Sequence, residues 1–372
     1  MARRAIYQVK VAGQDISSKL LPILVSLETT DKEGSSSDTA SISIDDKDQV
    51  IRFPKTGDPM SVSFGWEGEG LSVVFTGTVD EVQSSGSRGG GRVLSISAKG
   101  IDTQSKVKQH QHLNIDKANL ETALKKAGEQ AGITDIKVDA ELAGIERDWW
   151  GLDGESFIAF AERTAREVGG IFKIQGSKAA MVSKTGRAVS GADMPTVTAA
   201  WGDNLIAWDI RPVTGRPRHK TVKARYYDRK EAKWKEAEAS VQNEDDVLVS
   251  YGKKSGSDEG DAVSTSKGKA KEVERDKGGG TVEIDGTALA RPGGTCIISG
   301  ARAGIDGSYR IEEVSHSYSN SGWTTRLTVK LPSDSAGKDT RSPKKPKPKK
   351  STGSNGSSGG ASVGGDDILV PS

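Results

Sequence analysis

The chain has 372 residues, enough for two or three domains at about 100–200 residues each. Its residues are 34% apolar and 28% charged, as in a water-soluble protein, and its net charge is only +2. This charge argues against a nucleic-acid-binding protein, because neutralising phosphates requires a strong basic excess. The single cysteine, Cys296, excludes an intramolecular disulfide and a cysteine-cluster metal site.

The first hundred residues show the pattern of β-strands. Apolar and polar residues alternate in the segments 41–44, 60–64 and 93–97, which is the period of a half-buried strand. Clusters of turn-forming residues separate these segments. We therefore predict a first β domain over residues 1–105.

The pattern changes at about residue 106. Apolar residues recur at helical spacing from Leu120 to Ala131, and Gly132 is a suitable C-cap. A second helix is expected after Asp153, a candidate N-cap, and Gly169 should end it. A two-residue hairpin turn at Gly176 follows. Residues 106–195 are therefore predicted to form a small α+β domain.

Strands return from residue 196 onward. They are expected at 221–227, 281–284, 295–298, 309–314 and 325–329, with Cys296 as a small apolar strand residue. The charged, Gly-rich stretch 243–280 is interpreted as a surface excursion with at most one polar helix. Residues 196–335 thus form a second predicted β domain.

The C-terminal part lacks core-forming residues. Residues 336–365 have the basic, Pro-rich and then Gly/Ser-rich composition of a disordered, flexible linker. The last segment, 366–372, is apolar again. Its Ile368, Leu369 and Val370 are candidate interface residues that dock on a partner, although an unstructured end is an open alternative.

The two β regions share one scheme of residues. Pro54, followed by a glycine and a strand, matches Pro292, also followed by a glycine and a strand. Further on, the segment 77–82 matches 309–314, and a closing strand follows each. The sequence therefore predicts two related β-barrels on either side of the α+β insert, in a mainly β fold.

The ordered set of these motifs resembles the phage late control protein D family. The resemblance covers roughly residues 5–332 and is strongest in the insert. There the first helix precedes Trp149 and Trp150, and the segment 165–172 precedes the hairpin. The ending 306–316 also resembles the last barrel of that family. The family includes baseplate hubs of contractile tails and is similar to the N-terminal part of VgrG spikes.

This resemblance implies two tube-like β-barrel domains, over residues 1–105 and 196–335, and a structural, non-enzymatic role. The expected protein is a homotrimeric baseplate hub that adapts a sixfold tail tube to a threefold central spike around a channel. Its implied partners are further copies of itself, the tail tube protein, the spike protein and the baseplate wedge proteins, with the tape measure protein as a further candidate. It would be a virion tail protein made and assembled in the host bacterial cytoplasm, with no secretion signal and no membrane anchor.

Chemical motifs are weak. His110 and His112 have the spacing to share a metal with Asp116, or are simply exposed polar residues entering the insert. Pairs of acids such as Asp80 and Glu81 occur at strand ends, unlike the buried carboxylate that a glycosidase requires. No catalytic, cofactor-binding or metal-binding residues are therefore predicted. A tail-associated peptidoglycan hydrolase and a DNA-binding late-gene regulator are the alternative functions.

Tryptophans are the remaining candidates for contact with partners. Trp149 and Trp150 are predicted interface residues, because tryptophan is enriched at the energetically dominant positions of interfaces. Packing inside a core is an equally good reading for either of them.

Overall fold

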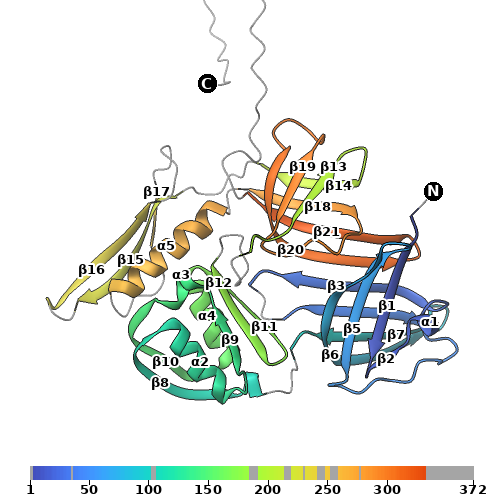
Figure 1. Ribbon diagram of the computed structural model, residues 1–372, viewed down its shortest axis with the longest axis horizontal. Coiled ribbons are helices and arrows are strands. Elements are labelled where there is room, and N and C mark those ends of the chain that lie inside the picture. The colour runs from blue at the N-terminus through green and yellow to red at the C-terminus, as the bar shows by residue number, and fades with distance from the viewer. Residues whose placement is uncertain are drawn as a thin grey trace, which may run out of the picture. The chain divides into compact units, whose positions relative to one another are not determined.

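The computed structural model describes residues 3–34, 37–101, 106–183, 192–212, 219–228, 231–240, 248–251, 259–275 and 278–331 (Figure 1). Strands predominate in these ranges, and the largest sheet joins 13 of the described strands. The mainly β fold with an α+β insert is thus confirmed. The segments 336–365 and 366–372, with Ile368, Leu369 and Val370, lie outside the described residues.

The first β unit, called module 1, covers residues 5–99. Six of its described strands follow the order β1-β5-β6-β7-β4-β3 in the sheet. They are β1 (Ala5–Val11), β3 (Leu24–Lys32), β4 (Thr39–Asp45), β5 (Pro59–Trp66), β6 (Gly70–Ser87) and β7 (Gly91–Lys99). A short β2 (Gln14–Asp15) pairs with β1, and α1 (Ser17–Leu20) follows it. The alternation in the sequence is correct here, since Ile42 and Ile44 are fully buried on one face of β4.

The second β unit, called module 2, covers residues 196–330 without the excursion between its second and third strands. Its described strands follow the order β13-β19-β20-β21-β18-β14. They are β13 (Thr196–Ala200), β14 (Leu205–Arg211), β18 (Gly279–Asp285), β19 (Thr295–Ser299), β20 (Gly307–Ser319) and β21 (Gly322–Lys330).

The two modules are copies of one design. In each, the six strands named above, counted in chain order without the two-residue β2, are arranged as first, fourth, fifth, sixth, third and second. A bulge also recurs at matching places. It falls between Val79 and Glu81 on β6 and between Ile311 and Glu313 on β20. The repeat predicted from 77–82 and 309–314 is therefore confirmed. The modules differ in one pairing, because β1 runs antiparallel to β5 whereas β13 runs parallel to β19.

The insert forms its own hydrophobic cluster between the two modules in sequence. Its elements are η1 (Lys106–Lys108), β8 (His110–Asn119), α2 (Leu120–Gln130), β9 (Asp135–Val138), α3 (Ala140–Ala143), β10 (Glu146–Ser156), α4 (Phe157–Val168), β11 (Gly170–Gln175) and β12 (Lys178–Ser183). Both predicted helices and the hairpin are present. The predicted boundaries 1–105, 106–195 and 196–335 remain a proposal.

One predicted helix cap is wrong. Asp153 lies within β10, whose ladder with β8 continues to the pair Ser156 and His110. The cap of α4 is Ser156, whose side-chain oxygen accepts a hydrogen bond from the Ala159 N–H at 3.3 Å. The predicted stop is correct, because Gly169 ends α4 with a φ of 73°.

The excursion is larger than the sequence indicates. It contains β15 (His219–Asp228), β16 (Lys233–Ser240), β17 (Leu248–Tyr251) and α5 (Glu259–Arg275). The segment 221–227, expected among the strands of the second barrel, pairs instead with β16 and β17 in a separate sheet. Its buried Ala224 and Tyr226 pack against Ala262 of α5. Their alternation is the same in either sheet, so the pattern alone does not reveal the partner strand.

Candidate assembly interface

Trp150 is a core residue and not part of a surface. It is 2% exposed, and its indole N–H donates to the Ala118 carbonyl oxygen at 2.7 Å. The Arg147 guanidinium lies 4.4 Å from its ring centroid. The structure thus overturns the interface assignment of Trp150, because a fully packed and hydrogen-bonded indole has no surface left for a partner.

Trp149 lies at the surface, where a predicted interface residue must lie. It is 49% exposed, and its indole N–H donates to the Asn114 side-chain oxygen at 3.3 Å. Neighbouring residues of a strand point to opposite faces, which explains the contrast with Trp150. A role of Trp149 in binding remains a prediction.

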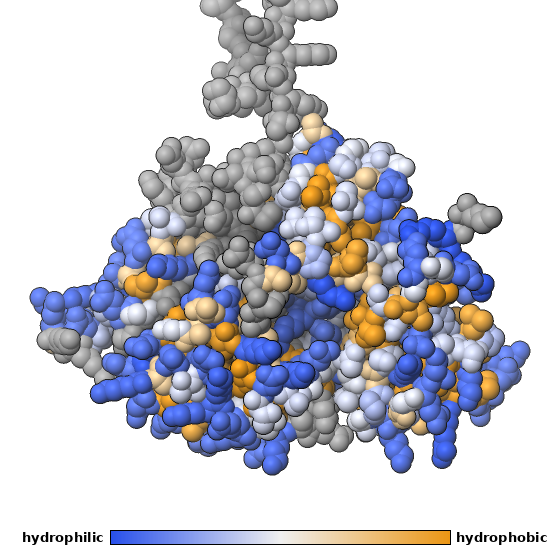
Figure 2. All heavy atoms as spheres, in the orientation of Figure 1, coloured by the Kyte–Doolittle hydropathy of each residue, from blue (hydrophilic) through white to orange (hydrophobic). Residues whose placement is uncertain are grey.

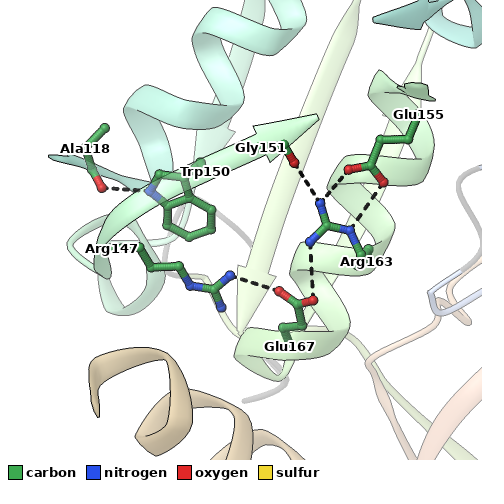
Figure 3. Close-up of polar contacts among 7 residues, drawn as sticks. All are labelled: Ala118, Arg147, Trp150, Gly151, Glu155, Arg163 and Glu167. Atoms are coloured by element: carbon green, nitrogen blue, oxygen red, sulfur yellow. Dashed lines mark hydrogen bonds and ion pairs between the residues drawn. The ribbon is translucent and has the colours of Figure 1, made fainter. Parts of the chain in front are cut away.

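A network of charged side chains holds α4 against β10 (Figure 3). Arg163 donates to the Glu155 carboxylate and to the Gly151 carbonyl oxygen, the latter at 3.1 Å. Glu167 accepts from Arg163 at 3.3 Å and from Arg147 at 2.9 Å. These acids are all paired with arginines, so the network is structural and leaves no carboxylate arranged as a general acid.

The histidine pair gives no sign of a metal site. His110 and His112 both lie exposed on β8, and the His112 Nδ1 is 3.2 Å from the Asp153 carboxylate. Asp116 pairs in the ladder with Trp149. Among the described residues, no three His, Cys, Asp or Glu side chains form a group suited to a metal ion. None of the described helices combines the length and apolar character needed to span a bilayer.

The two modules are joined by a continuous sheet. β3 of module 1 pairs antiparallel with the last half of β20, from Lys32 opposite Glu313 to Ser26 opposite Ser319. Thr30 and Ser315 also share a side-chain hydrogen bond of 3.2 Å. We call this pairing the junction.

Aromatic rings from module 2 complete the core of module 1 at the junction. Trp323 of β21 is 3% exposed and belongs to the hydrophobic cluster of module 1. Its ring centroid lies 5.5 Å from those of both Phe64 and Trp66. The Tyr318 ring lies tilted against the Tyr7 ring, with centroids 4.7 Å apart. Local sequence patterns do not indicate these contacts between the modules.

The junction also buries charge. The Arg310 guanidinium pairs with the Glu33 carboxylate at 3.1 Å, and both side chains are nearly buried. Lys173 of the insert forms ion pairs with Asp31 and Asp38 of module 1. Burial, together with the charge of Asp31, raises the pKa of Asp38 to about 6. The insert is therefore tied to module 1 by a charged contact.

Burial keeps two titratable groups elsewhere in the modules uncharged. Burial raises the pKa of the Cys296 thiol to about 12, so it acts as a small apolar strand residue, as predicted. Burial and the nearby Arg291 charge lower the pKa of His316 to about 3. Its Nδ1 lies 3.0 Å from the Thr325 hydroxyl, which supports a neutral ring in a packing role.

Comparison with known sequences gives two informative relatives, while no family model matches the chain. The probable baseplate hub protein of Escherichia phage P2 is 28% identical over 199 residues, 53% of this chain and 50% of that protein. Its counterpart in Escherichia phage 186 is 32% identical over 96 residues, 26% of this chain and 24% of that protein. The resemblance to phage baseplate hub proteins is confirmed. The alignments span half or less of these relatives' lengths.

Solved structures with the same fold come from tail proteins. A tail protein from Neisseria meningitidis MC58 aligns with a TM-score of 0.65 at 18% identity, covering 88% of this chain and 97% of that one. The 43 kDa tail protein of prophage MuSo2 from Shewanella oneidensis aligns with a TM-score of 0.62 at 15% identity, covering 89% and 97%. The E. coli c3393 protein, described as a type VI secretion component, gives 0.53 at 10% identity, covering 90% and 79%. At these identities the likeness concerns the fold.

Proposed function

We propose that this chain is a structural baseplate hub subunit of a contractile tail or related injection particle. It acts as a homotrimer that connects a sixfold tail tube to a threefold central spike and leaves a channel along the axis. The observation that carries this proposal is the duplicated module. Three chains with two modules each present six equivalent units to the tube but three chains to the spike.

The hub similarity supports the same role. The relatives in phages P2 and 186 are described as probable baseplate hub proteins, and the aligned folds come from tail and type VI secretion proteins. The tail tube protein, the spike and the baseplate wedge proteins would be the partners. The tape measure protein is a further candidate inside the channel, and the protein would reside in the tail baseplate.

The proposal excludes catalysis and specific DNA binding. The paired acids of the insert and the inert Cys296 support a structural role. A peptidoglycan hydrolase would instead produce cleared bands when the purified chain is run in a gel containing cell walls. A DNA-binding regulator would show salt-dependent affinity for DNA. A positive result in either assay contradicts the proposed function.

Deletion of the gene provides the decisive experiment. Particles made without the chain should contain tube and spike proteins that no longer purify together, and supplying the chain should restore their joint purification. Tails that keep the spike at normal occupancy without this chain would refute the hub assignment.

A further inference from the structure

The two strands that pair at the junction each have a counterpart in the other module, and these counterparts do not pair with each other within the described residues. At the junction β3, the second strand of module 1, pairs with the last half of β20, the fifth strand of module 2. The second strand of module 2 is β14, and its ladder is with β18. The fifth strand of module 1 is β6, and its last half pairs with β7 alone among the described strands. Within the residues that the structure describes, each of these two strands therefore keeps one lateral edge that carries no ladder, next to which a further strand could pair.

The irregularities of the strands fix which residues are equivalent. β3 and β14 both have a bulge one residue after their first position, at Val25 and at Ile206. Val25 is 50% exposed and Ile206 is 46% exposed, so the bulged residue also has the same environment in both copies. The matching bulges of β6 and β20 align Val82 with Val314.

The junction then supplies a register for pairing between two copies of the chain. Within one chain, Leu27 lies opposite Tyr318. Their equivalents are Trp208 on β14 and Gly86 on β6. By the same rule, Asp209 lies opposite Ser85 and Ala207 opposite Ser87.

The sizes of the facing side chains are complementary at both places. At the junction the aromatic residue, Tyr318, is on the fifth strand and faces Leu27 of the second strand. At the free edges the aromatic residue is on the second strand. Trp208 is half-buried there, with Trp201 in edge contact at 5.0 Å between centroids, and it would face Gly86. The large residue thus changes strands between the two places, and this keeps the total side-chain volume of each facing pair similar.

The edge of β6 lies in a hollow that fits this reading. The hollow has a volume of about 500 Å³ and is lined by Ile51, Phe53, Ser84, Gly86 and Arg92, among others. Phe53 is 58% exposed on its wall. The opposite edge is apolar, since apolar side chains gather over β14 and β18 on the face shown in Figure 2. Asp46, Gln49, Ser84, Ser85 and Arg92 make most of the lining polar, and Ile51 and Phe53 supply its apolar part. Because the hollow lies beside β6, whose counterpart β20 receives β3 within the chain, a second copy is the favoured occupant.

We propose that β14 of one copy adds antiparallel to residues 83–87 of β6 in a second copy, with Trp208 opposite Gly86. This inference rests on the proposed trimeric hub and specifies its interface. The contact is heterologous, because the two edges are different surfaces, and such contacts form a ring when the rotation between copies closes. Around the ring, the β3–β20 pairing within each chain would then alternate with the equivalent β14–β6 pairing between neighbouring chains.

Paired cysteines test the register. The full chain carries Ser85→Cys with Asp209→Cys, or Ser87→Cys with Ala207→Cys. Directly opposed residues on antiparallel strands are close enough for a disulfide. The control carries Ser87→Cys with Arg211→Cys, which the proposed register separates by about 14 Å along the strand. The buried Cys296 does not interfere. Oxidation of the purified chain and of assembled tails should give covalent trimers from the first two variants and not from the control.

The outcomes separate the interface from the function. A chain that sediments as a trimer, or is present in tails, but forms no crosslink in the proposed register overturns the interface and leaves the hub intact. Equal crosslinking in the control also overturns the interface. A chain that is monomeric and absent from tails overturns both proposals.

A bulky residue at Gly86 gives a second test without cysteines. A Cβ at Gly86 meets no atom closer than 3.5 Å within the chain, so Gly86→Trp should fold normally. In the proposed interface it would clash with Trp208 and raise the concentration needed for half-maximal trimer by roughly tenfold or more. Ser72→Trp, exposed on the half of β6 that pairs with β5, is the control and should stay within about twofold. Equal trimer formation by Gly86→Trp and the wild type would overturn the proposed register.

Discussion

Replacement of Trp323 by alanine should open the junction between the modules. The Trp323 ring is 3% exposed and packs against Phe64 and Trp66 of module 1. Its six-membered ring also covers Gly286, where an added Cβ would lie 2.0 Å from Trp323. A buried tryptophan changed to alanine costs about 3–5 kcal/mol, because the neighbours relax only partly into the cavity. We place Trp323→Ala at the upper end of this range, since rigid aromatic rings surround the cavity.

Hydrogen exchange measures this effect where it occurs. The amides of residues 26–32 and 313–319 pair across the junction. They should exchange roughly a thousandfold faster or more in Trp323→Ala, since each factor of ten corresponds to about 1.4 kcal/mol. Trp323→Phe should restore most of the protection. The matched control is Trp234→Ala, which removes a 63% exposed ring and should leave these amides unchanged. An increase below about tenfold in Trp323→Ala would refute the shared core.

Three other perturbations have defined outcomes. Lys173→Met should lower the free energy of unfolding more at pH 8 than at pH 5. The pKa of Asp38 is already raised to about 6 by burial and a neighbouring acid, and it rises further without the cation. A folded protein that holds an acid with a raised pKa loses stability as the pH rises through that pKa. Equal losses in denaturant titrations at both pH values would contradict this. Gly268→Val should detach α5 from α4 and increase proteolysis of the excursion, because a Cβ there would lie 2.9 Å from the Gly169 nitrogen. Unchanged cleavage would show that the helices do not need this close approach. Deletion of 366–372 should leave the trimer intact in sedimentation and reduce occupancy of one baseplate partner in purified tails, whereas full occupancy would make the segment dispensable.

Local patterns were sufficient to predict much of the fold. Alternation placed strands such as β4, and helical spacing placed α2 and α4, because a buried face repeats every two residues in a strand and about every 3.6 in a helix. The glycine that ends α4 was also predicted, since a left-handed residue is needed there. The duplication was readable because both copies retain the same order of proline, glycine and paired acids.

Partners distant in sequence were not predictable in the same way. The strand at 221–227 alternates like a barrel strand, yet it pairs with β16 in a separate sheet. Asp153 has the right residue type for a helix cap, but β10 extends past it. Trp149 and Trp150 are the same residue type, and only the face of the strand on which each side chain lies makes one exposed and the other buried. The junction depends on long-range pairing, for which local periodicity carries no signal.

The junction has a consequence for the order in which the chain folds. Thr30 and Ser315 hydrogen-bond across it although they are 285 positions apart. Module 1 is translated first, but its hydrophobic cluster includes Trp323 from the last strand of module 2. A ribosome must therefore deliver both modules before the first core can close, and until then the edge of β3 has no neighbour. In the proposed trimer, each chain would therefore be complete before it contacts another chain.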